Sequence, residues 1–231
     1  MLEKLCDDGN FVLSRALANE GQATFLVCAP TASMATAEML ARLQNILGLQ
    51  HELDQSFATT PRELVEDAGG AALILDDPGA TLLAWTVGSP WELLPFLRAA
   101  CGMAAALAGL HARGLVHKDV HPGNIFVNVA DGRAWLTGFG IASRLPKERQ
   151  ALAPPEVIAG TLAYMSPEQT GRMNRSIDSR SDLYSLGITL HEMATGGLPF
   201  HANDPLEWIH CHIAREPASA GQLPGPLAAI L

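Results

Sequence analysis

The sequence His-Lys-Asp-Val-His-Pro-Gly-Asn occupies residues 117–124, on a polar loop between an Ala/Leu-rich segment and the short apolar run 125–127. Asp119 can accept the proton of a substrate hydroxyl, or orient that hydroxyl, through its carboxylate. Asn124, at the end of the loop, offers an amide oxygen to a hard cation such as Mg²⁺. The same residue types favour ordinary turns, so this stretch alone leaves a polar turn open as the alternative.

Two downstream segments narrow the interpretation. The loop resembles the catalytic loop of protein kinases, H-R-D-x-x-x-x-N, and also the H-G-D-x-H-P-x-N loop of small-molecule kinases related to the aminoglycoside phosphotransferases. Residues 160–168, Gly-Thr-Leu-Ala-Tyr-Met-Ser-Pro-Glu, resemble the G-T-x-x-Y-x-x-P-E end of the activation segment in Ser/Thr protein kinases. Residues 182–187, Asp-Leu-Tyr-Ser-Leu-Gly, resemble the D-x-Y-S-L-G helix of that family. Small-molecule kinases lack both, so the resemblance is to protein kinases and covers nearly the whole chain.

A narrower resemblance concerns the context of the domain. Residues 160–193, with 204–217 after them, are similar to the kinase-like domain at the N-terminus of large bacterial sensor histidine kinases. The resemblance implies that the partners are proteins or other domains of a larger signalling kinase. The resemblance to protein kinases implies that Asp182 braces the backbone around His117.

The resemblance to protein kinases further implies roles for individual residues. Asp119 would be the catalytic base and Asn124 a magnesium ligand. Thr161 would form a hydrogen bond near Asp119 and shape the substrate site. The cofactors would be ATP and Mg²⁺, with His121 contributing from the loop and Asp77 through its backbone at a hinge, where the adenine would lie.

The sequence departs from the family at the groups that hold magnesium and phosphates. Residues 138–140 read Gly-Phe-Gly where the family has D-F-G, so Gly138 replaces the aspartate that bridges magnesium to the phosphates. No lysine lies in the segment 24–28, the strand expected to carry one. Arg15, on the neighbouring predicted strand, is the alternative cation that could approach the phosphates.

The loop expected to hold the phosphates, ahead of residue 11, also departs from the family pattern. Gly9 is the only glycine ahead of the first predicted strand, and Asp7 and Asp8 precede it directly. A phosphate cradle needs backbone N–H groups without nearby anions, so these two carboxylates would repel a triphosphate.

Magnitudes indicate what these departures mean for activity. A metal-anchored clamp supplies several kcal/mol of transition-state stabilisation, and about 1.4 kcal/mol corresponds to a tenfold change in rate. General-base assistance from Asp119 is worth only about 10² to 10⁴. We therefore expect impaired phosphoryl transfer, weak binding of ATP and Mg²⁺, and a regulatory or docking role. The alternative is an active Ser/Thr kinase with an atypical metal site, and a small-molecule phosphotransferase is disfavoured.

Composition excludes other classes. The chain has 231 residues, 48% of them hydrophobic, and can bury a real core. Its net charge of −9 argues against a nucleic-acid partner. The most apolar run, 99–110, is shorter than the roughly 20 residues that a membrane span needs. The four cysteines lie far apart and the N-terminus lacks the apolar core of a signal peptide, so a cytoplasmic location is expected.

The resemblance to protein kinases implies an α+β, two-lobed protein-kinase-like fold, and the hydrophobic periodicity predicts its individual strands and helices. We expect a β-rich lobe with one helix over residues 1–78, a hinge near 76–80, and a mainly helical lobe over 79–231. The apolar end of the chain lies within a predicted helix, so the second lobe is expected to be truncated. Strands are predicted over 11–17, 24–28, 71–75, 115–116, 125–127 and 134–136, with helices within 32–53, 91–113 and 181–195, the last with Leu183, Leu186, Leu190 and Met193 on one side.

Overall fold

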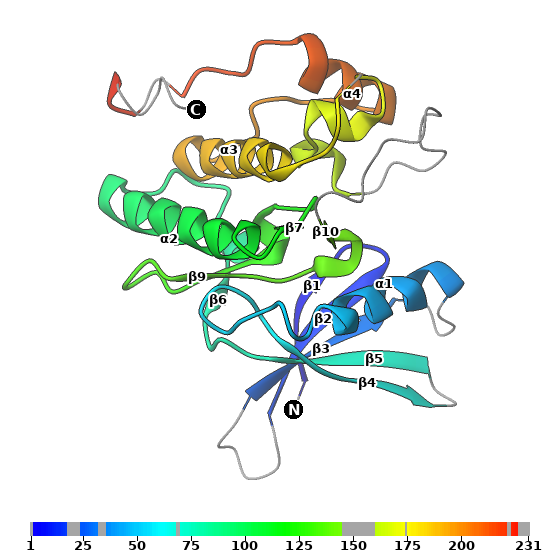
Figure 1. Ribbon diagram of the computed structural model, residues 1–231. Helices are drawn as coiled ribbons and strands as arrows, with labels where there is room; N and C mark the ends of the chain where they lie inside the picture. The colour runs from blue at the N-terminus through cyan, green and yellow to red at the C-terminus, as the bar shows by residue number, and fades with distance from the viewer. Residues whose placement is uncertain are drawn as a thin grey trace.

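The computed structural model describes residues 2–17, 24–31, 36–67, 70–144, 160–173, 175–220 and 223–225. A twisted sheet with the helix α1 (Ala37–Gly48) forms one part of the molecule, and the helices α2 (Leu93–His111), α3 (Ser179–Thr195) and α4 (Pro205–Ala214) with short strands form the other (Figure 1). The predicted α+β, two-lobed kinase-like fold is confirmed. The predicted domain boundary between 78 and 79 stays a prediction. Residues Asn19, Glu20 and Gly21 also predict a hairpin-like turn between the first two predicted strands, and they lie outside the described residues.

The sheet of the first part is antiparallel, with its strands in the order β1-β2-β3-β5-β4. The predicted strands over 11–17, 24–28 and 71–75 are confirmed, whereas β1 and β4 were not predicted. Those two are the edge strands, and each exposes much of its length, so neither carries the apolar run that marks a central strand. The strands are β1 (Leu2–Asp7), β2 (Phe11–Leu17), β3 (Thr24–Pro30), β4 (Pro61–Asp67) and β5 (Gly70–Asp76).

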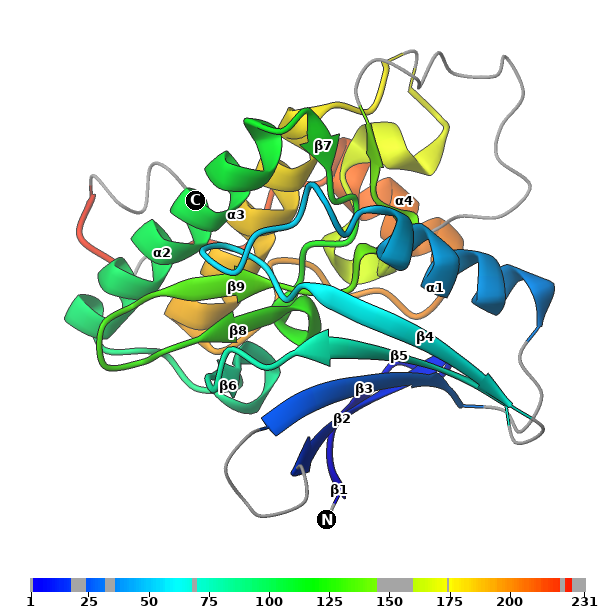
Figure 2. The ribbon, with the colours of Figure 1, turned by 60° about the horizontal axis from the view of Figure 1, so that its bottom comes forward.

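One helix, α1 (Ala37–Gly48), lies over this sheet on the side that faces the rest of the molecule (Figure 2). Thr36 caps its start by accepting a hydrogen bond from the backbone N–H of Met39, at 3.2 Å. Leu43 and Ile46 form its buried face. The helix is shorter than the predicted span 32–53, because turns replace it after Gly48.

The second part is built from helices around short strands. The helices are α2 (Leu93–His111), α3 (Ser179–Thr195) and α4 (Pro205–Ala214), and α2 and α3 lie side by side in both views (Figures 1 and 2). The short strands are β6 (Thr81–Leu82), β7 (Leu115–Val116), β8 (Ile125–Val127), β9 (Ala134–Leu136) and β10 (Ser143–Arg144), and β8 and β9 pair as an antiparallel hairpin.

The predicted apolar face of α3 is wrong at one position. Leu183 is 52% exposed, whereas Leu186 and Met193 are buried. Asp182 is fully buried because its carboxylate binds the loop at 117–118. Successive helical residues are turned by about 100°, so burying Asp182 turns Leu183 toward solvent.

The segment between α1 and β4 joins the two parts. The backbone N–H of Leu136 donates to the carbonyl of Phe57 at 2.8 Å, and that of Thr59 donates to the carbonyl of Leu136 at 2.9 Å. The indole N–H of Trp135 donates to the carbonyl of Gln55 at 2.8 Å. Buried side chains from both parts therefore form one continuous core.

Among the described residues, one helix, α2, is both long enough and apolar enough to cross a membrane. It is longer than the apolar run 99–110 considered above. Its residues Phe96, Met103 and Leu107 are buried in the core beside β9 and α3. The core helix of a soluble protein passes the same test, so the composition of α2 is weak evidence for a span.

Two helical glycines give a matched test of this packing. A Cβ on Gly102 in α2 would overlap the backbone oxygen of Gly132, whereas a Cβ on Gly187 in α3 would meet nothing within 4 Å. We expect Gly102→Ala to lower the free energy of unfolding by about 1–3 kcal/mol. Gly187→Ala should raise it by about 0.5–1 kcal/mol. Urea unfolding of both variants measures this, and equal stability of Gly102→Ala and the wild type would contradict the packing.

Candidate active site

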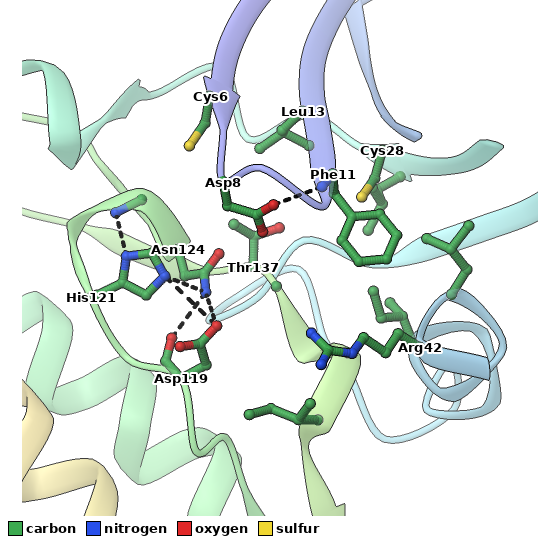
Figure 3. Close-up of a pocket in the computed structure, with 17 residues that line it drawn as sticks. Cys6, Asp8, Phe11, Leu13, Cys28, Arg42, Asp119, His121, Asn124 and Thr137 are labelled. Carbon is green, nitrogen blue, oxygen red and sulfur yellow. Dashed lines mark hydrogen bonds and ion pairs between the residues drawn. The ribbon is translucent and has the colours of Figure 1, made fainter. Parts of the chain in front are cut away.

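A cleft lies between the sheet, α1 and the loop 117–124 (Figure 3). Its empty space, measured out to the mouth, is about 740 Å³. Asp119 and Asn124 line it from the loop, Cys28 and Leu13 from the sheet. The structure thus brings the predicted catalytic residues to one wall of a concave site.

The loop is held by a buried carboxylate. Asp182 accepts hydrogen bonds from the backbone N–H groups of His117, at 2.9 Å, and Lys118, at 2.8 Å. The ring Nε2 of His111 lies 2.8 Å from the same carboxylate. Lys118 has φ of +70°, the one positive φ among the described residues other than glycine. The hydrogen bonds to Asp182 therefore stabilise a backbone conformation that residues other than glycine rarely adopt.

His117 fixes the loop from beneath. Its ring is fully buried, Nε2 lies 2.8 Å from the carbonyl oxygen of Thr137, and Nδ1 accepts from the backbone N–H of Asp119 at 3.2 Å. Burial lowers the pKa of His117, although the nearby carboxylates oppose this. A neutral ring with its proton on Nε2 satisfies both contacts.

Asp119 is oriented by several donors. Its Oδ1 accepts from the backbone N–H of Thr161, at 2.9 Å, and from the Thr161 hydroxyl, at 3.0 Å. Its Oδ2 accepts from Nδ2 of Asn124 at 3.1 Å and lies 3.7 Å from Nε2 of His121. Burial opposes the charged form, but His121 and the Thr161 amide outweigh it and hold the pKa of Asp119 below its usual range. The carboxylate is therefore charged at neutral pH, and its role as the base stays a prediction.

Asn124 occupies the space beside Gly138. Its Nδ2 donates to the backbone oxygen of Asp119 at 2.9 Å and lies 2.9 Å from Nε2 of His121 (Figure 3). A Cβ on Gly138 would overlap the amide group of Asn124. Gly138 has φ of +77°, which also favours glycine. The side chain that the family has at this position would therefore collide with Asn124 as it stands.

The residues present do not fit a magnesium ion that bridges a triphosphate. Gly138 has no side chain that could supply an oxygen ligand. The hydroxyl of Thr137 already accepts a hydrogen bond from the hydroxyl of Thr59, at 3.0 Å. Within the described ranges, no group of three or more His, Cys, Asp or Glu side chains could hold a metal ion. Mg²⁺ prefers several carboxylate and phosphate oxygens in octahedral geometry. The roles of Asn124 as a magnesium ligand and of His121 as a cofactor contact stay predictions.

The sheet wall of the cleft is uncharged. Cys28, paired with Leu13 in the β2–β3 register, lines the cleft on the strand expected to carry a lysine. Burial raises the pKa of Cys28 to about 12, so the thiol is neutral. Asp8, at the turn after β1, also lines the cleft, close to Thr137 in the view of Figure 3.

A cation enters the cleft from α1 instead. Arg42 lines the cleft and points into it, and its Nη2 donates to Glu38 at 2.7 Å (Figure 3). Asn45, one turn later, donates from Nδ2 to the carbonyls of Phe139, at 3.1 Å, and Ala142, at 3.0 Å. Neither residue was predicted to take part. The sequence offered one indication of their role, which is that both residues directly precede apolar positions on the buried face of the helix.

Arg15 does not approach the loop, so its predicted role near the phosphates is wrong. Its guanidinium binds the carboxylate of Asp77 and the carbonyl of Ala80. The burial of Asp77 favours this partner, because a buried carboxylate must be paired. The backbone role of Asp77 toward an adenine stays a prediction.

The segment after residue 160 is tied to the loop. Ser166 and Gln169 form a capping box. Nε2 of Gln169 also donates to the backbone oxygen of Lys118 at 2.6 Å. The segment therefore carries Thr161 to Asp119 and closes over the strained turn.

Replacing the buried carboxylate tests how much the loop depends on it. Asp182→Asn puts an amide donor beside donors that need acceptors, so the free energy of unfolding should fall by about 3 kcal/mol or more. Asp178→Asn is the control, since Asp178 caps the same helix in a more exposed position and Asn caps equally well. Urea unfolding of both variants decides the matter, and equal losses would contradict the bracing role.

The lowered pKa of Asp119 predicts a pH-dependent contribution. A carboxyl whose folded-state pKa is lowered stabilises the fold above its unfolded value, near 3.9, and this is lost as pH falls through the folded pKa. Thr161→Val removes one donor, so the pKa of Asp119 should rise. The variant should lose about 1 kcal/mol of stability at pH 7, and less below about pH 4.

Thr189→Val is the control for that experiment. The Thr189 hydroxyl is buried and donates to the carbonyl of Ser185 at 3.0 Å, with no titratable partner. Its loss of stability should not depend on pH. Denaturant unfolding between pH 3 and 7 compares the two, and parallel profiles would contradict the assigned link between Thr161 and Asp119.

Comparisons with known proteins relate this chain to protein kinases. A family model described as the protein kinase domain matches residues 97–220. The chain is 43% identical over 132 residues to the serine/threonine-protein kinase AfsK of Streptomyces griseus, covering 57% of this chain and 16% of that relative. It is 37% identical over 142 residues to the serine/threonine-protein kinase Pkn1 of Myxococcus xanthus, covering 60% and 20%.

The serine/threonine-protein kinase PknB of Mycobacterium tuberculosis is 36% identical over 112 residues, covering 48% of this chain and 17% of that relative. The aligned segments thus span about a fifth or less of the length of these relatives. The family match runs from within α2 to beyond α4 and includes the loop, Gly138 and the segment after residue 160. It covers more than half of the chain, which therefore belongs to the protein kinase family.

Proposed function

We propose that this domain is a kinase-like regulatory or docking module with impaired phosphoryl transfer. One observation carries the proposal. The amide of Asn124 occupies the space next to Gly138, where a metal-binding carboxylate would begin. A magnesium ion at this place would lack the charged protein ligand that the family provides. Phosphoryl transfer depends on such a bound metal ion, because it neutralises the charge that develops on the phosphates.

The remaining charges of the cleft support the same proposal. Asp8 and Asp119 line it as carboxylates, and Cys28 faces it with a neutral thiol. Arg42 is the cation among these lining residues, and it is shared with Glu38. Such a cleft repels a triphosphate more than it attracts one, so ATP and Mg²⁺ should bind weakly.

The biological setting is part of the proposal. The aligned relatives are much longer serine/threonine-protein kinases. Together with the resemblance of residues 160–217 to the kinase-like domain of sensor histidine kinases, this supports a place in a larger bacterial signalling kinase. The partners would then be other domains of that kinase or separate proteins, in the cytoplasm.

A second candidate is an active Ser/Thr protein kinase with an atypical metal site. The observation that favours it is the complete set of donors around Asp119, which keeps a charged acceptor aimed at the cleft. Substrate hydroxyls need such an acceptor. Transfer would still need charge neutralisation from groups other than residue 138.

An assay with radiolabelled ATP separates the two candidates. With Mg²⁺ or Mn²⁺ and generic protein substrates, we expect incorporation no higher than in reactions without enzyme, since the metal-binding carboxylate is missing. A kinase domain with an intact D-F-G motif is the positive control. Robust incorporation that Asp119→Asn abolishes would overturn the proposal in favour of an active kinase.

A further inference from the structure

Arg15 lies on the face of the sheet that forms the roof of the cleft. In the register of the sheet, Arg15 is opposite Leu26 on β3, and Leu26 is opposite Leu75 on β5. Directly opposite residues of antiparallel strands share a face, as do residues two apart along one strand. Arg15 therefore shares the face of Leu13 and Cys28, which line the cleft.

The guanidinium of Arg15 is fixed by three hydrogen bonds. Nε donates to Oδ2 of Asp77 at 2.7 Å, and Nη2 donates to Oδ1 of Asp77 at 3.0 Å and to the backbone oxygen of Ala80 at 2.7 Å. The Asp77 side chain has no exposed surface, and it also accepts from the backbone N–H of Gly79 at 3.0 Å. A bidentate pair of this kind is rigid as well as strong.

The surroundings of this guanidinium suit a flat ring. Leu26 lies beside it on the neighbouring strand, with Leu75 one strand further, and the ring of Phe126 lies beneath, 6.0 Å from the central guanidinium carbon. The backbone of residues 77–80 borders it at the edge. Apolar faces with backbone polar groups at one edge are what a planar heterocycle needs.

The open part of the cleft stops short of this place. Leu75 lines the cleft, but among the residues that the structure describes, none of 76–80 does. The open space runs instead toward α1 and Asn124 (Figure 3). Arg15 and Asp77 thus close the outer end of the cleft with their own ion pair.

We propose that Arg15 acts as a plug that fills the planar-base subsite, so that the domain excludes adenine nucleotides at the hinge. The proposal rests on the proposed function, because it gives that impaired domain a second reason not to use ATP. A base could enter only by breaking the pair with Asp77 and leaving a buried carboxylate unpaired. The lost magnesium carboxylate acts on the phosphates, whereas the plug acts on the base.

Adenosine is the appropriate ligand for the test, because it has no phosphates and needs no metal. The test variant combines Arg15→Ala with Asp77→Asn, which opens the subsite and avoids an unpaired carboxylate. Calorimetric titration should show adenosine binding to this double variant with a Kd at least about tenfold below that of the wild type. The matched control is Arg62→Ala, which breaks the neighbouring pair with Asp76 on the exposed edge of the hinge and should leave adenosine affinity as in the wild type.

Equal adenosine affinity in the wild type and the double variant, or no binding to a folded double variant, would overturn the plug. Should the double variant not fold, NMR of the wild type decides. Adenosine should leave the Nε–H signal of Arg15 and the amides of 75–80 unshifted, and saturable shifts there would overturn the proposal. Adenosine binding by the wild type without phosphate incorporation removes the plug alone, whereas incorporation from ATP removes the proposed function.

Discussion

The carboxylate of Asp182 is the contact on which the site depends. It lies fully buried on α3 and binds two consecutive backbone N–H groups of the loop, at His117 and Lys118. The positive φ of Lys118 is costly for a side-chain residue and persists because these bonds hold it. The turn in this place directs Asp119 into the cleft, where Thr161 and Asn124 can reach it. Removing the brace would loosen every distance described for the site.

The charges of the cleft are redistributed rather than simply reduced. The acidic side is intact, with Asp119 held charged by its donors. The cations have moved, since Arg15 is committed to Asp77 and Arg42 reaches the cleft from a helix instead of a strand. Gly138 and Asn124 depend on each other sterically, because the amide group of Asn124 occupies the position that a Cβ on residue 138 would take. The departures from the family therefore form one consistent arrangement, which fits the proposed weak binding of a magnesium triphosphate.

Sequence patterns predicted the central elements and missed the peripheral ones. Apolar runs identified β2, β3 and β5, because these strands lie inside the sheet and expose little of their length. The edge strands β1 and β4 carry charges and a proline, and their hydrogen-bonding partners come only with the assembled sheet. Leu183 shows the same limit in a helix, since periodicity alone could not tell that a buried carboxylate would set the rotation of α3.

The order of motifs along the chain was enough to determine the family, the loop with Asp119 and Asn124, and the absence of an aspartate at 138, because these are properties of residue type and spacing. Which side chains occupy the space left behind was decided only by the tertiary structure. Arg15 and Asp77 lie 62 positions apart, and Asn45 reaches backbone carbonyls 94 to 97 positions away. Which partner a polar side chain binds depends on distance and burial in the folded chain, and neither quantity can be read from a linear pattern.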